Sequence, residues 1–189
     1  MKKILFVILP VIAIGGADAG VMDVYAGATG GFGYKSNRAL FEDPAASEDR
    51  SASSFGVVAG IDIPVFRVEA EYNYITSYAG DMGLFLVNGY VKAPIPMIKP
   101  YIGMGIGTLA GPGEAYFSSA SFSGEAEEVF AIQAMAGVQI EIPATKLFVD
   151  LEFRPMYLDG VYKVVGETET QNRGFWHADV RLKVRYIIF

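Results

Sequence analysis

Apolar residues recur at every second position through most of this chain, a period of two that is typical of β-strands. The C-terminal segment shows it most clearly, because Val180, Leu182 and Val184 alternate with Arg181 and Lys183. Successive side chains of a strand point to opposite faces, so each such segment has one apolar face and one polar face. Since no segment shows convincing helical spacing, the pattern predicts an all-β protein.

Eight segments show this alternation, and connections of two lengths join them. The segments cover residues 21–34, 54–63, 66–78, 83–93, 98–109, 129–142, 146–157 and 176–188. The tight turns begin at Pro64, Pro94 and Pro143. Long polar connections cover residues 35–53, 110–127 and 159–173, and one short connection lies near residues 79–81. An even number of strands, with short turns at one end and long loops at the other, is typical of outer-membrane β-barrels. Their turns lie in the periplasm, so both termini are expected there.

The N-terminus has the three parts of a secretory signal peptide. Two lysines precede an apolar run at residues 4–14, and an A-x-A cleavage motif ends at Ala19. This run is too short to cross a bilayer as a helix, which needs about 20 apolar residues. The sequence therefore predicts a signal peptide at residues 1–19, cleaved after Ala19, and a barrel domain at residues 20–189.

Charge and cysteine content exclude several functional classes. The chain has a net charge of −6 and no basic stripe that could neutralise phosphates, so no nucleic acid is expected as a partner. It contains no cysteine, which excludes disulfides, thiolate metal sites and thiol nucleophiles. We expect no metal and no cofactor.

A soluble, lipocalin-like barrel of eight strands would show the same alternation, and the aromatic residues favour the membrane barrel instead. The apolar faces carry too many rings to fill a small interior, and most of the rings lie near strand ends, as in the aromatic girdles of membrane barrels. The expected girdle comprises Tyr74, Tyr78, Phe130, Tyr157, Trp176 and Tyr186. Gly103, Gly105 and Gly107 lie on the opposite face, where they would leave room for bulky charged neighbours. The predicted fold is an eight-stranded antiparallel up-and-down transmembrane β-barrel.

The polar faces then line the lumen, where charged groups must pair. An eight-stranded barrel is just wide enough for side chains to fill, and an unpaired buried charge costs several kcal/mol. The expected charge network comprises Glu69, Glu71, Lys92, Asp150, Glu152, Arg154, Arg181, Lys183 and Arg185. We expect the acids of residues 146–157 to meet the bases of the last strand, and Lys92 to reach Glu69 or Glu71.

Three of these strands also carry a family resemblance. The segments RVEAEY at residues 67–72, KPYIGMGIG at 99–107 and VDLEFR at 149–154 resemble recurrent strands of the opacity-protein-like small outer-membrane barrels, relatives of the membrane domain of outer membrane protein A. The resemblance covers essentially the whole mature chain. It implies an eight-stranded barrel in the bacterial outer membrane, with outer-membrane lipids and the outer-membrane assembly machinery as partners.

The resemblance also implies a terminal aromatic strand, and Phe189 ends this chain. Here the sequence departs from the usual ending, because Ile188 continues the lipid-facing parity and Phe189 does not. Either a bulge or a final residue beyond the strand pairing would account for the difference.

Three functions remain open from the sequence. The first is a structural, surface-exposed barrel with a largely plugged lumen, whose variant is a narrow porin-like pore. The alternative is an adhesin or surface antigen whose acidic loops bind an extracellular host or matrix ligand. The third is a lipid A-modifying enzyme at the barrel rim. His177 lies two residues before Asp179, but no serine is expected on a lumen-facing position beside it, so no catalytic residue is predicted and the chain is not expected to be an enzyme.

Overall fold

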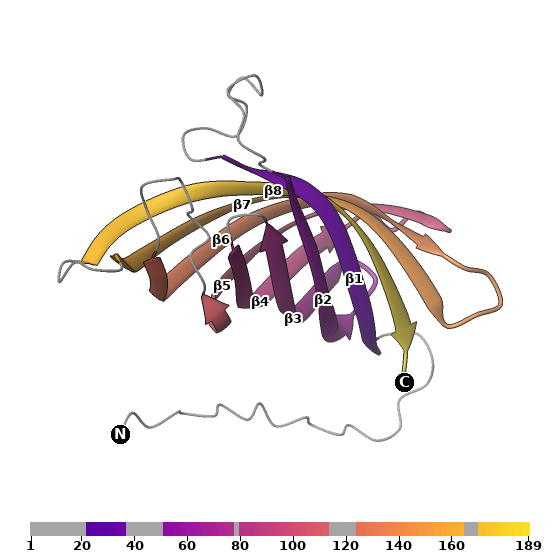
Figure 1. Ribbon diagram of the computed structural model, residues 1–189. Coiled ribbons are helices and arrows are strands. Elements are labelled where there is room, and N and C mark those ends of the chain that lie inside the picture. The colour runs from indigo at the N-terminus through magenta and orange to yellow at the C-terminus, as the bar shows by residue number, and fades with distance from the viewer. Residues whose placement is uncertain (1–21, 37–50, 78–79, 114–123, 165–169) are drawn as a thin grey trace.

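The computed structural model describes residues 22–36, 51–77, 80–113, 124–164 and 170–189, which form a closed barrel (Figure 1). Its strands are β1 Asp23–Ser36, β2 Ser51–Asp62, β3 Phe66–Ser77, β4 Gly80–Lys92, β5 Ile98–Gly113, β6 Gly124–Glu141, β7 Leu147–Val164 and β8 Thr170–Ile187. Tyr78 and residues 1–19, which hold the predicted signal peptide, lie outside the described part of the chain.

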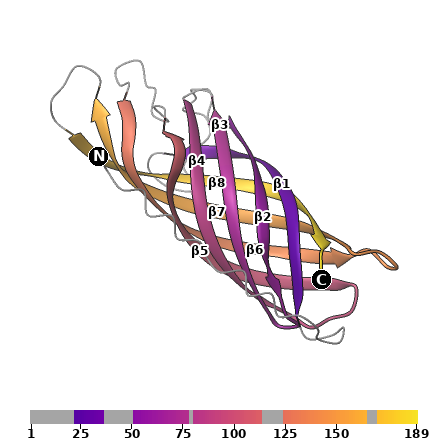
Figure 2. The ribbon, with the colours of Figure 1, turned by 90° about the horizontal axis from the view of Figure 1, so that it is seen from below.

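Each strand pairs antiparallel with its neighbours in sequence, and β1 pairs with β8 to close the barrel (Figure 2). Closure removes the unpaired edges that an open sheet would expose. The prediction of a closed barrel of eight antiparallel strands is therefore confirmed. None of the described residues form a helix long and apolar enough to cross a bilayer.

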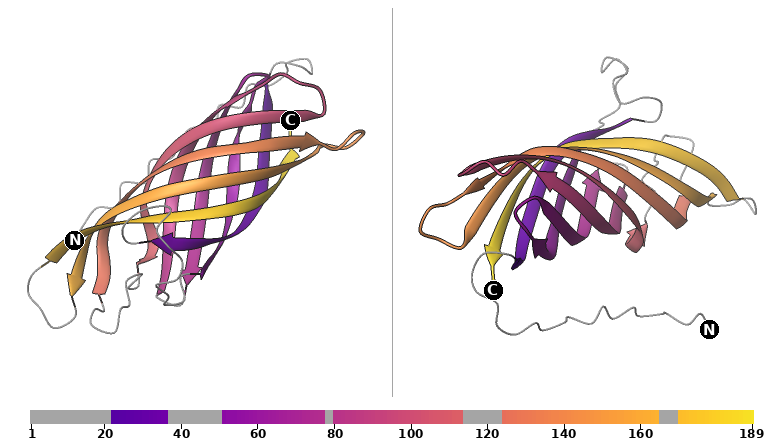
Figure 3. Two further views of the ribbon diagram at one scale, coloured as in Figure 1. Left: turned by 90° about the horizontal axis from the view of Figure 1, so that it is seen from above. Right: turned by 180° about the vertical axis from the view of Figure 1, so that it is seen from behind.

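The two ends of the barrel differ. Residues 63–65, 93–97 and 142–146 connect the strands at one end, which we call the turn end, and β8 finishes there. The opposite end is the loop end. Figure 3 shows the strong tilt of the strands between the two ends.

Several strands extend further toward the loop end than the alternation predicts. β6, β7 and β8 each have 18 residues, whereas β1 to β4 have 12 to 14. The predicted connections at residues 110–127 and 159–173 are therefore wrong in extent, since the β7–β8 ladder continues to the pair Lys163 and Thr170. Similarly, β2 begins at Ser51, inside the predicted connection 35–53. Backbone hydrogen bonds hold a ladder whether or not its side chains alternate, so the pattern stops before the strands do.

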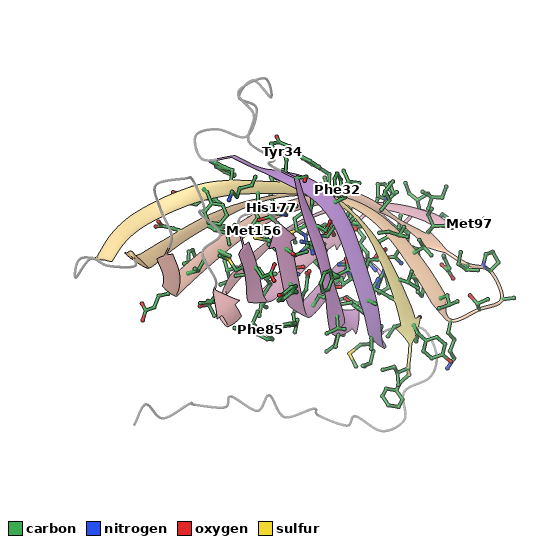
Figure 4. All side chains as sticks on the ribbon, in the orientation of Figure 1. Phe32, Tyr34, Phe85, Met97, Met156 and His177 are labelled. Atoms are coloured by element: carbon green, nitrogen blue, oxygen red, sulfur yellow. The ribbon has the colours of Figure 1, made fainter. Side chains whose placement is uncertain are left out.

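Apolar side chains cover the outside of the barrel. Leu182 is 53% exposed on this surface, whereas its neighbours Arg181 and Lys183 are at most 1% exposed inside. Figure 4 shows the same division, with Phe32 and Phe85 on the outer surface and His177 between the walls. The period of two in the sequence therefore corresponds to the outer and inner faces of the wall.

Five of the six predicted girdle residues lie on the outer surface, and the sixth, Tyr78, is outside the described residues. Four of these five lie toward the loop end, where the rings of Tyr157 and Trp176 are 5.1 Å apart and Tyr74 packs against Phe55 at 5.2 Å; Phe130 is the fourth. Tyr186 lies near the turn end and is 53% exposed. Their contact with the membrane interface remains a prediction.

The two residues after β8 remain hydrogen-bonded to β1. β8 finishes at Ile187, and Phe189 follows as an exposed residue. The backbone N–H of Val24 donates to the carbonyl of Phe189 at 3.2 Å. The N–H groups of Ile188 and Phe189 both donate to the carbonyl of Val24, at 2.8 and 3.5 Å, so two residues face one. Of the two explanations for the parity of Phe189, the structure therefore shows a bulge.

Candidate functional site

Charged side chains fill the lumen from the turn end to the middle of the barrel. The buried acids are Asp62, Glu69, Glu71, Asp150, Glu152 and Asp179, and the buried bases are Arg67, Lys92, Arg154, Arg181, Lys183 and Arg185. All nine residues of the predicted charge network are among them, whereas Asp62, Arg67 and Asp179 were missed. The two groups are equal in number, so the described network is neutral overall.

Glu71 on β3 is the centre of this network. It accepts hydrogen bonds at 2.8 Å from Nη1 of Arg154 on β7 and from Nη1 of Arg181 on β8, and another at 2.9 Å from the amide of Asn88. Four strand positions separate β3 from β7 in either direction around the barrel. The Arg154–Glu71 pair therefore bridges opposite walls and crosses the lumen.

The next layer toward the turn end is built around Glu69. Lys183 Nζ lies 2.6 Å from Glu69 Oε1, and the hydroxyls of Tyr25 and Tyr90 donate to the same carboxylate at 2.7 and 3.0 Å. A carboxylate with three donors has its lone pairs largely satisfied, which a buried ion pair needs if it is not to be destabilising.

A second pair crosses the lumen closer to the turn end. Arg67 on β3 donates to Asp150 on β7 at 3.2 Å, and its guanidinium lies 3.9 Å from the ring centre of Tyr90 and 4.6 Å from that of Tyr101. Arg185 also donates to Asp150, at 2.7 and 3.0 Å. The barrel is thus crossed at two levels.

The pairing of Lys92 differs from the prediction. Its ammonium contacts Asp62 at the turn end, not Glu69 or Glu71. The register explains the difference, because Glu69 pairs with Asn88, four residues further up β4 and about 13 Å away at 3.3 Å per residue.

The expected pairing between β7 and β8 occurs only in part. Asp150 meets Arg185, and Glu152 lies 3.9 Å from Lys183. Arg181, in contrast, pairs with Glu71 and with Asp179 on its own strand.

Apolar side chains fill the lumen above the network, toward the loop end. We call this cluster the apolar plug; it comprises Ala52, Ile75, Met82, Leu84, Leu86, Val129, Ala131, Met156, Leu158 and Phe175, all at most 2% exposed. The alternation does not predict this cluster, because β4 is apolar on both faces and a period of two cannot then assign the inner face. The unbroken apolar run at residues 84–87 is the signal that could have indicated it.

The side chains of His177 and Asp179 lie in the lumen, at the boundary between the charge network and the apolar plug. Asp179 Oδ2 accepts a hydrogen bond from Ser54 Oγ at 2.7 Å and lies 3.2 Å from His177 Nε2. The expectation that no lumen-facing serine lies beside His177 is therefore wrong, since β2 brings Ser54 there. Both contacts go to the carboxylate, whereas a serine nucleophile needs the imidazole itself to accept its proton.

Glycines on β1 make room for the large cations. A Cβ added to Gly31 would lie 2.6 Å from Arg181 Cγ, and one added to Gly27 would lie 3.0 Å from Arg185 Cγ. The glycines of β5 were expected to accommodate charged neighbours, and this is wrong. A Cβ at Gly103, for example, would meet the neutral ring of Tyr90, and at Gly105 and Gly107 it would meet Asn88 and Leu86.

One comparison with solved structures supports the fold. The sequence matches no family model and no curated protein. The structure resembles the crystal structure of Neisserial surface protein A (NspA), with a TM-score of 0.63 and 14% identity over 86% of this chain and 96% of that chain. A second match is the solution structure of outer membrane protein H (OprH) from P. aeruginosa, with a TM-score of 0.49 and 16% identity over 85% and 99% of the two chains. The NspA match supports the fold of a small outer-membrane β-barrel.

Proposed function

We propose, from the premise that the chain folds as a small outer-membrane β-barrel, that it is a structural, surface-exposed protein whose lumen is closed. The observation that carries this proposal is the pair of side-chain bridges across the lumen, Arg154 to Glu71 and Arg67 to Asp150. A water-filled channel needs a continuous polar path, and these bridges occupy its cross-section.

The apolar plug adds a second barrier of a different kind. Leu84, Met156 and Phe175 are almost completely buried inside the wall, so the loop half of the lumen is lined by groups that cannot replace the hydration shell of an ion. Apolar constrictions of this kind block conduction by excluding water. The two barriers in series support a closed barrel over a narrow pore.

The proposed topology places the turn end in the periplasm and the loop end outside the cell. It rests on the turn lengths and on the predicted signal peptide, with cleavage after Ala19. The apolar outer surface then contacts outer-membrane lipids, and the outer-membrane assembly machinery inserts the chain.

Planar-bilayer recording of the purified protein tests the closed lumen. We expect at most small and rare openings, because neither barrier leaves a continuous path for water. Large, steady openings of the wild type would contradict the proposal and favour an open porin. Raising the salt concentration should increase the frequency of openings only slightly, because buried ion pairs are only weakly screened.

We further propose that the protein is not an enzyme. A lipid A-modifying site has to face the outer leaflet of the membrane. His177, Asp179 and Ser54 instead lie inside the barrel, each at most 3% exposed, and they are held in the charge network. Incubation with lipid A followed by mass spectrometry should leave the lipid unchanged.

Presentation to an extracellular partner, as an adhesin or surface antigen, is a second candidate. The observation that favours it is the length of β6, β7 and β8, whose 18 residues rise about 42 Å at a 45° tilt. The apolar band of an outer-membrane barrel is only about 25 Å tall, so these strands extend well beyond it. Cells that display the full-length protein should adhere to a surface coated with extracellular matrix, and cells that display a variant lacking residues 114–123 and 165–169 should not. Equal adhesion by cells without the protein would contradict this candidate function.

A further inference from the structure

An open cavity of about 670 Å³ lies at the turn end of the barrel. The turns of residues 63–65, 93–97 and 142–146 surround it, and Figure 4 shows Met97 at this end. Asp62 and Lys92, which belong to the charge network, also line it. Because the network closes the lumen above, the cavity is a one-sided vestibule. Under the topology proposed above, it opens to the periplasm.

One of the carboxylates that line the vestibule has no ion-pair partner among the described residues. Lys92 pairs with Asp62, and Lys99 pairs with Glu141 at 3.1 Å. Asp23 forms no ion pair within the described residues, although it is close enough to both pairs to interact with their charges. Arg185 also donates to Asp62, at 3.1 Å, so Asp62 and Glu141 are compensated and the carboxylate of Asp23 is the one available to an incoming cation.

A buried acceptor in the same cavity provides a second, independent indication of a ligand. Gln139 lines the vestibule and is only 1% exposed, yet its Oε1 has no hydrogen-bond partner. A buried carbonyl oxygen without a partner costs about 1–3 kcal/mol, so such groups are rare unless something else satisfies them. Because this oxygen has almost no accessible surface, an N–H donor in the vestibule satisfies it once the Gln139 side chain rotates toward the cavity.

Several other side chains that line the vestibule are apolar, and they indicate which class of cation would bind there. Ile63, Met97 and Phe148 contribute hydrocarbon and aromatic surface beside the polar groups. Such a surface suits a methylene chain and disfavours a fully hydrated metal ion, which would lose water contacts there. A cationic head on a short hydrocarbon stem fits both parts of the cavity.

We propose that the vestibule binds a primary alkylammonium group from the turn end. The ammonium pairs with Asp23 and donates a hydrogen bond to Oε1 of Gln139, and its methylene chain packs on Phe148. Two sources have this chemistry, namely a free polyamine and a lysine side chain of a periplasmic polypeptide. The proposal does not depend on whether the lumen conducts.

The test is an NMR titration of the full-length protein in detergent micelles, with the side-chain amide of Gln139 as the reporter. Spermidine and a pentalysine peptide are the two cationic probes, and 1,5-pentanediol and Mg²⁺ are the controls for hydrocarbon and for charge alone. We expect saturable shifts of the Gln139 amide with an ammonium probe and none with either control. Binding by spermidine alone would identify a free polyamine as the ligand class, and stronger binding by pentalysine would identify a polypeptide.

Three variants separate a built site from general attraction to an acidic barrel. Asp23→Asn and Gln139→Leu should each weaken binding about fivefold or more, as expected for loss of one charge-assisted contact in a partly open site. Because Gln139→Leu lacks the side-chain reporter, the backbone amide of Asp23 reports binding in that variant and in the wild type beside it. Asp81→Asn removes the same charge at the loop end and should leave binding unchanged. Equal weakening by Asp81→Asn, no shift in the wild type, or competition by Mg²⁺ at the same concentration would each overturn the proposal. Electrophoretic mobility of the folded barrel establishes that each variant has folded.

Discussion

Arg154 and Glu71 face each other across the full width of the barrel, with Nη1 of the arginine 2.8 Å from both carboxylate oxygens. They belong to β7 and β3, which are on opposite walls. The pair therefore joins two strands that share no backbone hydrogen bond. Its contribution can be separated from that of strand pairing.

We expect Arg154→Met to destabilise the barrel by about 3 kcal/mol, because it leaves buried carboxylates without full compensation. Urea unfolding in lipid vesicles measures the change. Adding Glu71→Gln to this variant should recover part of the loss, since the uncompensated charge is removed. Lys99→Met is the matched control: its pair with Glu141 is partly exposed, so the loss should stay below about 1 kcal/mol. Equal losses of unfolding free energy for the two methionine variants would show that the pair across the lumen stabilises the barrel no more than a partly exposed pair does.

Opening the lumen should require changes in both barriers. Glu71→Ala with Asp150→Ala removes both ion bridges but leaves the apolar plug in place, and Leu84→Ser with Met156→Ser leaves the ion bridges in place. We expect neither double variant to show steady conductance in planar bilayers, whereas the combined quadruple variant should show frequent openings. Steady conductance in the Glu71→Ala and Asp150→Ala double variant would indicate that the plug does not exclude water.

The two faces of β7 should respond differently to substitution. Leu151 is 50% exposed on the outer surface, whereas Glu152 is buried in the lumen. An arginine near the bilayer midplane costs about 2–4 kcal/mol, so Leu151→Arg should impair folding into vesicles. Glu152→Gln should be milder, because Arg154 keeps Glu71 and Lys183 keeps Glu69 as partners. The reverse order of the two midpoints in a folding titration would mean that the faces are exchanged.

Two glycines offer a matched test of packing on the two faces. A valine at Gly31 would collide with the arginine stem and with Ser54, whose Oγ lies 2.7 Å from the added Cβ. We expect Gly31→Val to cost about 1–3 kcal/mol as an overpacked interior position. Gly89 faces outward with nothing within 4 Å of an added Cβ, so Gly89→Val should be neutral or slightly stabilising. Thermal unfolding in micelles would compare them, and a larger loss at Gly89 would contradict the packing described here.

Single cysteines can test the topology cleanly, because the chain has none of its own. A membrane-impermeant maleimide added to intact cells should label Ala45→Cys, in the connection between β1 and β2, and should spare Val65→Cys in the first turn. Lysed cells should show labelling of both. Labelling of the turn alone in intact cells would invert the proposed orientation.

The sequence by itself determined the eight strands, the antiparallel barrel and the assignment of the charged faces to the lumen. It could do so because successive side chains of a strand must point to opposite faces, and lipid requires one of these faces to be apolar. Where both faces of a strand are apolar, as on β4, the sequence does not show which face points inward. The apolar plug could therefore not be assigned. The ends of β6 to β8 could not be predicted from the sequence either, because their backbone hydrogen bonds continue beyond the alternating segments.

The tertiary structure alone decided which charges meet. Arg154 and Glu71 are 83 positions apart in the sequence and are joined only because the closed barrel places β3 opposite β7. Likewise, Lys92 pairs with Asp62 because the register of β3 and β4 places Glu69 beyond its reach. Alternation specifies the face on which a side chain lies but not its height in the barrel. That height is set by the stagger between strands, a property of the closed sheet as a whole.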